Sequence, residues 1–123
     1  DIITFSNDDY MTFYIDTFDH KERYENKIVE YDSQVFMSNK LPKDTFIAGR
    51  KVMNCCANDI QLCGFLVKST LGMKIKDRSW IHIKAKLVYE FSKDYNEEEV
   101  MLEPIEIKLI DPLDDDVLNL SGN

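Results

Sequence analysis

The sequence predicts a mostly β fold of the α+β type: a small OB-like barrel of five antiparallel strands with an N-terminal helix. Apolar and polar residues alternate along several segments, which is typical of half-buried strands. One segment near the N-terminus instead has the spacing of a helix face. A longer connector between the third and fourth strands suits an OB-like barrel, and closure protects strand edges. A chain of 123 residues is the size of one domain, so we expect residues 1–123 to share one core.

The predicted helix covers residues 7–20. Ser6 precedes it as a candidate N-cap, and the acidic residues of the first turn suit the helix dipole. The apolar side chains then follow the spacing i, i+3, i+4, i+7 and i+8, which defines one face of a helix. This face is aromatic, so we expect it to be buried. Its members are Tyr10, Phe13, Tyr14, Thr17 and Phe18.

Three strands are predicted in the first half of the chain, at residues 28–37, 46–55 and 60–68. The first of them alternates strictly between apolar and polar residues. The second contains Gly49, which is a candidate β-bulge. A tight turn at residues 57–59 joins the second and third strands into a hairpin, because Asn and Asp tolerate turn geometry.

The fourth strand, at residues 80–91, has the clearest alternation in the chain. The fifth is predicted at residues 100–110, where Pro104 indicates an edge or a bulge. The barrel therefore extends over residues 28–110, and an acidic tail follows at residues 111–123. The side chains of the fifth strand that we expect to face inward are Ile105, Ile107 and Leu109.

The net charge is −8, and it is unevenly distributed. Residues 91–123 contain 2 basic and 10 acidic side chains, whereas residues 50–86 contain 8 basic and 2 acidic ones. Affinity for a phosphate backbone comes mostly from Lys and Arg, so the acidic balance predicts no nucleic-acid binding. An OB module that binds sugar is a further hypothesis, which the charge does not test.

The sharpest local feature is the adjacent pair Cys55 and Cys56, with Cys63 seven residues further on. The spacing Cys-x2-4-Cys, the usual zinc signal, is absent, and three cysteines cannot form a complete disulfide set. One interpretation is structural: the pair ends the second strand, and Asp59 closes the turn by accepting backbone N–H bonds. The other is a metal-binding or thiol-sensing site with Cys55, Cys56, Asp59 and His82 as ligands and zinc as the candidate ion. We favour the structural interpretation and expect no other cofactor.

Few other residues are candidates for chemistry. His82 lies on the polar face of the fourth strand, where a simple surface position is the alternative to ligation. Arg50 and Trp80 are candidate binding residues. Trp80 and Tyr31 suit a stacking platform of the kind that OB folds use, and the favoured alternative is that both rings pack in the core. The sequence contains no G-x-S-x-G elbow, no P-loop and no G-x-G-x-x-G motif, so we do not expect an enzyme.

Three stretches of the sequence resemble a known family. Residues 50–67 read RKVMNCCANDIQLCGFLV and resemble the pattern R-x-x-M-x-C-C-x-x-D-x-x-x-x-G-x-x-V of a bacterial two-component permease subunit family. Residues 24–30 resemble its Y-x-G-K-x-V-x segment, and residues 80–85 resemble its W-V-x-V-x-G segment. Asn26 and Ala85 stand where that family has glycine, while the Cys-Cys motif is intact.

The resemblance implies a setting but no reaction. Members of that family are membrane-anchored chains with N-terminal transmembrane helices and a C-terminal domain of unknown function. By this resemblance we expect a domain at the cell membrane on its extracytoplasmic side, cut from a longer chain that carries the anchor. The implied partner is a predicted permease with several membrane spans. The leading hypothesis is a non-enzymatic accessory or binding domain; the alternative is the metal-binding or thiol-sensing domain.

Overall fold

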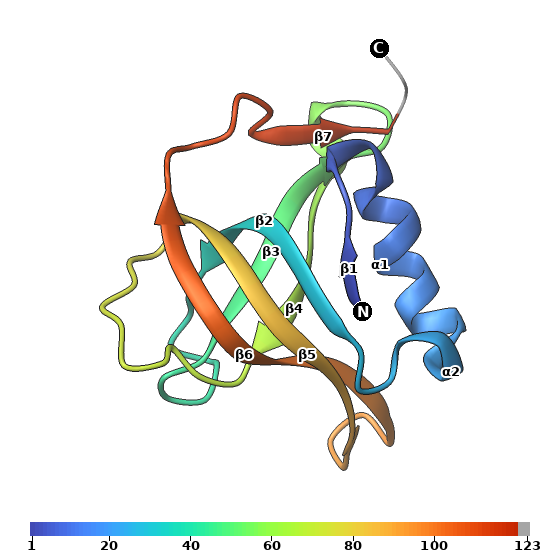
Figure 1. The fold of residues 1–123 in the computed structure, drawn as a ribbon. Coiled ribbons are helices and arrows are strands. Elements are labelled where there is room, and N and C mark those ends of the chain that lie inside the picture. Colours follow the sequence, from blue (N-terminus) through green and yellow to red (C-terminus); the bar gives the residue numbers. More distant parts are fainter. Residues whose placement is uncertain (121–123) are drawn as a thin grey trace.

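The structure is a computed structural model that describes residues 1–120 (Figure 1). The prediction of a mostly β fold with an N-terminal helix is confirmed. The predicted number of strands is wrong, because the described residues form seven strands in one mixed sheet instead of five. The strands are β1 (Ile2–Thr4), β2 (Ile28–Phe36), β3 (Phe46–Met53), β4 (Ile60–Val67), β5 (Trp80–Ser92), β6 (Glu97–Ile110) and β7 (Val117–Asn119).

The five long strands are joined by pairings that return to their start. β2 pairs with β5, β5 with β6, β6 with β4, β4 with β3, and β3 again with β2. The prediction that all strands are antiparallel is wrong, because β4 and β6 run parallel where Leu66 and Val67 meet Met101 and Leu102. The two short strands are also parallel to their neighbours, β1 to β2 and β7 to β3.

Both short strands were missing from the prediction, and both lie near the chain ends. Each has three residues, which is too short for an alternating pattern to show. β7 lies inside the segment that was expected to be a polar tail, and its Leu118 is buried against the core. The last residues of that expected tail, 121–123, lie outside the part of the chain that the structure describes.

The N-terminal helical segment packs against the sheet, on the right in Figure 1. The predicted helix is divided into η1 (Asn7–Asp9), α1 (Tyr10–Asp19) and α2 (Lys21–Tyr24). Its aromatic face is mostly buried, as predicted: Tyr10, Phe13 and Thr17 lie in the interior. Phe18 is instead exposed, because it lies one step round the helix from Thr17, toward solvent.

The hydrophobic core is formed mainly by alternate residues of the long strands, together with residues of α1 and β7. On β5 the inward side chains from Ile81 to Leu87 are fully buried, and the intervening His82 and Lys84 face outward, as the alternation predicts. The expected inward face fails at the end of the strand, where Phe91 is exposed. The members of the core from the long strands include Val29, Tyr31, Phe46, Ala48, Phe65, Val67, Ile81, Ile83, Leu87 and Leu102.

The inward pattern predicted for the fifth strand fails at two positions. Ile107 is buried, but Ile105 and Leu109 are more than half exposed. A register shift between Lys84 and Ala85 marks a β-bulge between β5 and β6, which breaks the alternation near Ile105. Beyond Leu102, β6 no longer pairs with β4, so its outer end lacks a second neighbouring strand among the described residues.

Gly49 lies at a close approach of two strands and not at a bulge. The register of β3 and β4 is continuous, and Gly49 lies opposite Gly64. A Cβ atom on Gly49 would lie 2.7 Å from the carbonyl oxygen of Cys63. The glycine pair therefore lets the two backbones meet at a distance that side chains would prevent.

Candidate functional site

Cys55 and Cys56 lie in the turn between β3 and β4, as the sequence predicts. Both thiols are exposed there, whereas the structural interpretation of the pair favoured two thiols buried by packing. The Sγ atoms lie 3.7 Å apart, and Cys55 Sγ lies 3.6 Å from Oδ2 of Asp59. The role predicted for the Asp59 side chain is different in the structure. Its carboxylate faces the Cys55 thiol, while its backbone N–H closes the turn η2 (Ala57–Asp59) by donating to the Cys56 carbonyl, at 2.9 Å.

The thiols differ in their surroundings. The pKa of Cys55 is raised by its hydrogen bond with Cys56, by desolvation and by the nearby Asp59 carboxylate. Burial raises the pKa of Cys63, which lies in the core. Cys55 is thus accessible but held in its protonated form by its neighbours, and a thiophilic ion must displace a proton to bind there.

His82 does not join the cysteine turn. Its Nδ1 lies 2.6 Å from Oδ1 of Asp32, and its Nε2 lies 2.7 Å from Oε2 of Glu30. This bridge, made mainly by the bond to Glu30, raises the pKa of His82 and lowers that of Glu30. Within residues 1–120, no three His, Cys, Asp or Glu side chains are grouped as a metal site. The four-residue metal set stays a prediction, and only Cys55, Cys56 and Asp59 of that set lie together.

Arg50 and Trp80 lie together, but in the interior. The Arg50 guanidinium lies over the Trp80 ring, with its Cζ 5.1 Å from the ring centre, and only 1% of Arg50 is exposed. Nη1 donates to the Asn7 side chain and Nη2 to the Asp115 carbonyl. Their role in ligand binding stays a prediction, and it requires the segment around Asp115 to move away from Arg50.

The Arg50 contacts join three distant parts of the chain. The arginine lies on an inward position of β3, and its partners come from the N-terminal segment and from the segment before β7. Burial lowers the pKa of Arg50, while the nearby acidic residues oppose that shift. Lys51 adds an ion pair to Asp116, at 2.9 Å. The position of Arg50 in the alternating pattern of the strand was the signal that could have predicted its burial.

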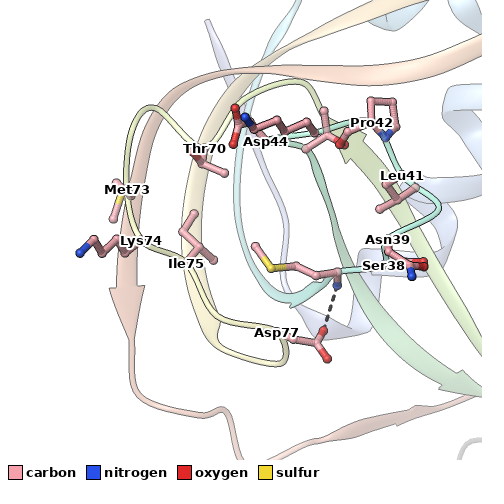
Figure 2. A pocket seen from close by; sticks show the side chains of 13 residues that line it. Ser38, Asn39, Leu41, Pro42, Asp44, Thr70, Met73, Lys74, Ile75 and Asp77 are labelled. Atoms are coloured by element: carbon pink, nitrogen blue, oxygen red, sulfur yellow. Dashed lines mark hydrogen bonds between the residues drawn. The ribbon is translucent and has the colours of Figure 1, made fainter.

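Sequence reasoning missed a cleft between two loops. The cleft has a volume of about 920 Å³ and lies between residues 37–45 and 70–77. Leu41 and Ile75 lie on its opposite sides, and Lys74 lies at its rim (Figure 2). The Met37 N–H donates to Oδ1 of Asp77 at 2.9 Å and so connects the loops. The sequence indicated that both segments are loops, but it did not indicate that they lie close together in space.

Comparison with known proteins gives a family and one distant relative. The model of the DUF1980 C-terminal domain matches residues 1–116. UPF0703 protein YcgQ from Bacillus subtilis (strain 168) is 25% identical over 93 residues, which is 76% of this chain and 33% of YcgQ. The chain thus spans about a third of the length of this curated relative. In the part of the chain described here, no helix has both the length and the apolar character needed to cross a bilayer.

Proposed function

We propose that this chain, which belongs to the DUF1980 C-terminal domain family by its match over residues 1–116, is a non-enzymatic accessory domain. It binds other components of a membrane complex and is carried by a longer, membrane-anchored subunit. The subunit acts with a permease that has several membrane spans, and the domain lies on the extracytoplasmic side of the cell membrane.

One observation carries this proposal: nearly the whole chain matches a family defined as a C-terminal domain, yet it spans only a third of YcgQ. A protein of that length has room for further segments, and the anchor belongs there. We infer the permease partner from the resemblance of residues 50–67 to the two-component permease subunits. That resemblance includes the Cys-Cys motif at the exposed turn.

The fold supports a binding role by analogy. We propose that the five long strands form an OB-like barrel, since their cyclic pairing and the parallel contact of β4 with β6 suit a partly open Greek-key barrel. OB folds bind ligands through their strand faces and connecting loops, and the cleft of this chain is formed by such loops. The analogy concerns the scaffold, and the ligand has to be found at the site itself.

The membrane setting is tested by fractionation of the full-length protein in its own cells. Membranes are washed with alkaline carbonate, which removes peripheral proteins, and intact cells are treated separately with a protease from outside. We expect the full-length protein to stay in the washed membranes and this domain to be digested from the outside. Full extraction by carbonate, or protection of the domain in intact cells, would contradict the proposal.

A second candidate function is binding of a thiophilic cation at the cysteine turn. It is favoured by the two exposed thiols, 3.7 Å apart, with the Asp59 carboxylate 3.6 Å from Cys55. Thiolates and a carboxylate are ligands that zinc accepts, and the side chains of Cys55, Cys56 and Asp59 would have to rotate to share one ion. An exposed turn suits reversible loading better than a closed structural site.

Thiol labelling of the folded chain tests this second candidate. We expect Cys55 and Cys56 to react with a maleimide before unfolding, because both are exposed, and Cys63 to react only after unfolding. Added zinc should slow the labelling of the pair at least tenfold, and Asp59→Asn should weaken this protection. Asn58→Ala, in the same turn, is the matched control. Labelling rates that zinc leaves unchanged would remove this candidate.

A further inference from the structure

The hairpin between β5 and β6 is the most exposed apolar feature of the chain. Tyr95 is 71% exposed and Phe91 is 61% exposed, the two highest values among its exposed large apolar side chains within residues 1–120. The hairpin projects from the body of the molecule, at the bottom of Figure 1. Isolated exposed apolar residues are ordinary, but two aromatic rings on one projecting hairpin are typical of an interface.

The hairpin is also strongly acidic. Residues 90–99 contain five acidic side chains and one basic side chain, a net charge of −4. Glu90 pairs with Lys68, and Glu98 pairs with Lys21 at 2.7 Å. The other acidic side chains make no ion pair with any residue of the described part. They are Asp94, Glu97 and Glu99. The exposed aromatic rings are thus surrounded by uncompensated negative charge.

The cleft has the complementary character. Its two loops, residues 37–45 and 70–77, contain four basic and two acidic side chains, a net charge of +2. Inside lie apolar side chains, among them Leu41 and the buried Ile75. A volume of about 920 Å³ falls within the range of pockets that hold drug-sized ligands, which is roughly 300–1,000 Å³. The cleft can therefore receive aromatic side chains, and its basic rim attracts an acidic segment.

We propose that the cleft is the docking site for the β5–β6 hairpin of a second copy of this chain. The occupant is assigned by charge and shape, because the same chain carries an acidic aromatic projection and a cleft with apolar lining residues between two loops of net positive charge. The hairpin and the cleft loops both lie toward the lower end of the molecule in Figure 1. A two-fold axis then lets each copy insert its hairpin into the other, which closes the assembly as a dimer.

This arrangement explains why neither feature is satisfied within one molecule. Phe91 and Tyr95 would be the buried anchors, which aromatic residues often provide at interfaces. Lys43 and Lys74, both exposed on the cleft loops, would meet Glu97 and Glu99 of the second copy. Rim charges of this kind speed association and fix its geometry, so the dimer should weaken as the salt concentration rises. The inference does not depend on the proposed permease.

Sedimentation equilibrium of the 123-residue chain, with a mass of 14.4 kDa, tests the dimer. We expect the average mass to approach twice this value as the protein concentration rises, and dissociation to increase at 0.5 M salt. The double variant Phe91→Ala/Tyr95→Ala should raise the dissociation constant at least tenfold. Ile15→Ala/Phe18→Ala, which removes exposed apolar side chains from α1, is the matched control and should leave it unchanged.

A charge exchange gives the sharper result. Lys43→Glu/Lys74→Glu should abolish the dimer, and so should Glu97→Lys/Glu99→Lys. An equimolar mixture of these two variants should restore association as a mixed dimer, in which one hairpin–cleft contact has the natural charges and the other has both charges reversed. Circular dichroism and thermal melting confirm that each variant is folded.

Three outcomes would overturn the inference. One is a monomer at every concentration up to about 1 mM. Another is a dimer that the hairpin and cleft variants leave intact. The third is a monomer whose hairpin, in the full-length protein, crosslinks to a different protein and loses that crosslink in Phe91→Ala/Tyr95→Ala. That third result would assign the hairpin to another partner.

Discussion

Arg50 is the charged side chain that lies buried within residues 1–120. It is a buried cation whose described partners are a side-chain amide, a backbone carbonyl and the face of an indole ring, and its Nε has no partner. Burying a charge without a carboxylate partner is costly, and the guanidinium offsets part of that cost by its fork of donors. The arginine thereby fixes the position of both terminal segments against β3.

Two substitutions separate the charge of Arg50 from its geometry. Arg50→Lys keeps the buried charge but loses the fork of donors, so it should lower the free energy of unfolding by about 2–3 kcal/mol. Arg50→Met removes the charge and fills similar space, so it should cost less. Urea denaturation measures both, with the exposed Arg23→Lys as control. A larger loss for Arg50→Met than for Arg50→Lys would contradict this account.

His82 makes the stability of the chain depend on pH. Glu30 and Asp32 on β2 face the imidazole, and Lys84 on β5 and Lys108 on β6 act on Glu30. The folded pKa of His82 is raised above its ordinary value of 6.5. The bridge therefore contributes fully below pH 6.5, and its contribution is lost as the pH rises through the folded pKa.

The matching experiment measures unfolding at a series of pH values above 6.5. The free energy of unfolding should fall more steeply with pH in the natural chain than in His82→Gln, because the glutamine side chain does not titrate in this range. His20→Gln, at the only other histidine, should keep the natural slope. Equal slopes in the natural chain and in His82→Gln would show that the bridge does not form.

The close contact of β3 with β4 requires glycine at two positions because there is no room for a Cβ atom, whereas a turn requires glycine for its backbone conformation. A Cβ atom on Gly64 would lie 2.7 Å from the Ala48 carbonyl oxygen, and the one on Gly49 meets the Cys63 carbonyl at the same distance. Both neighbours are backbone atoms, which cannot rotate away. Gly72 differs, because nothing lies within 4 Å of its Cβ position but its φ is +75°.

Alanine substitutions should reflect this difference. Gly49→Ala should lower the free energy of unfolding by about 2–3 kcal/mol, since the strands must separate. Gly72→Ala should lower it by about 1 kcal/mol, from backbone strain alone. Thermal and urea unfolding provide the measurement. An equal effect of the two substitutions would argue against the close approach at Gly49.

The elements that could be predicted are those whose pattern is local. The long strands follow from alternation, and the cysteine turn follows from turn-forming residues directly after a strand. The short strands β1 and β7 could not be predicted, because three residues carry no period and their partners lie far away in the sequence. The parallel contact of β4 with β6 could not be predicted either, because the paired residues lie far apart in the sequence.

The site could be predicted only in part, for reasons at the scale of the whole molecule. Cys55, Cys56 and Asp59 lie within five residues, so their proximity is local. His82 has carboxylate partners on another strand, and Arg50 has partners near both ends of the chain. The cleft unites two loops whose contact depends on the closed ring of strands. Such features follow from the complete fold.

The central claim is that this domain binds a membrane partner, and its most direct test uses membrane vesicles. Inside-out and right-side-out vesicles are prepared from cells with and without the permease, which crosslinking of the full-length protein identifies. The purified 123-residue chain is then titrated onto them. The account predicts saturable binding to right-side-out vesicles that contain the permease and none to those that lack it. Equal binding to right-side-out vesicles with and without the permease would contradict it, and so would the absence of binding to either.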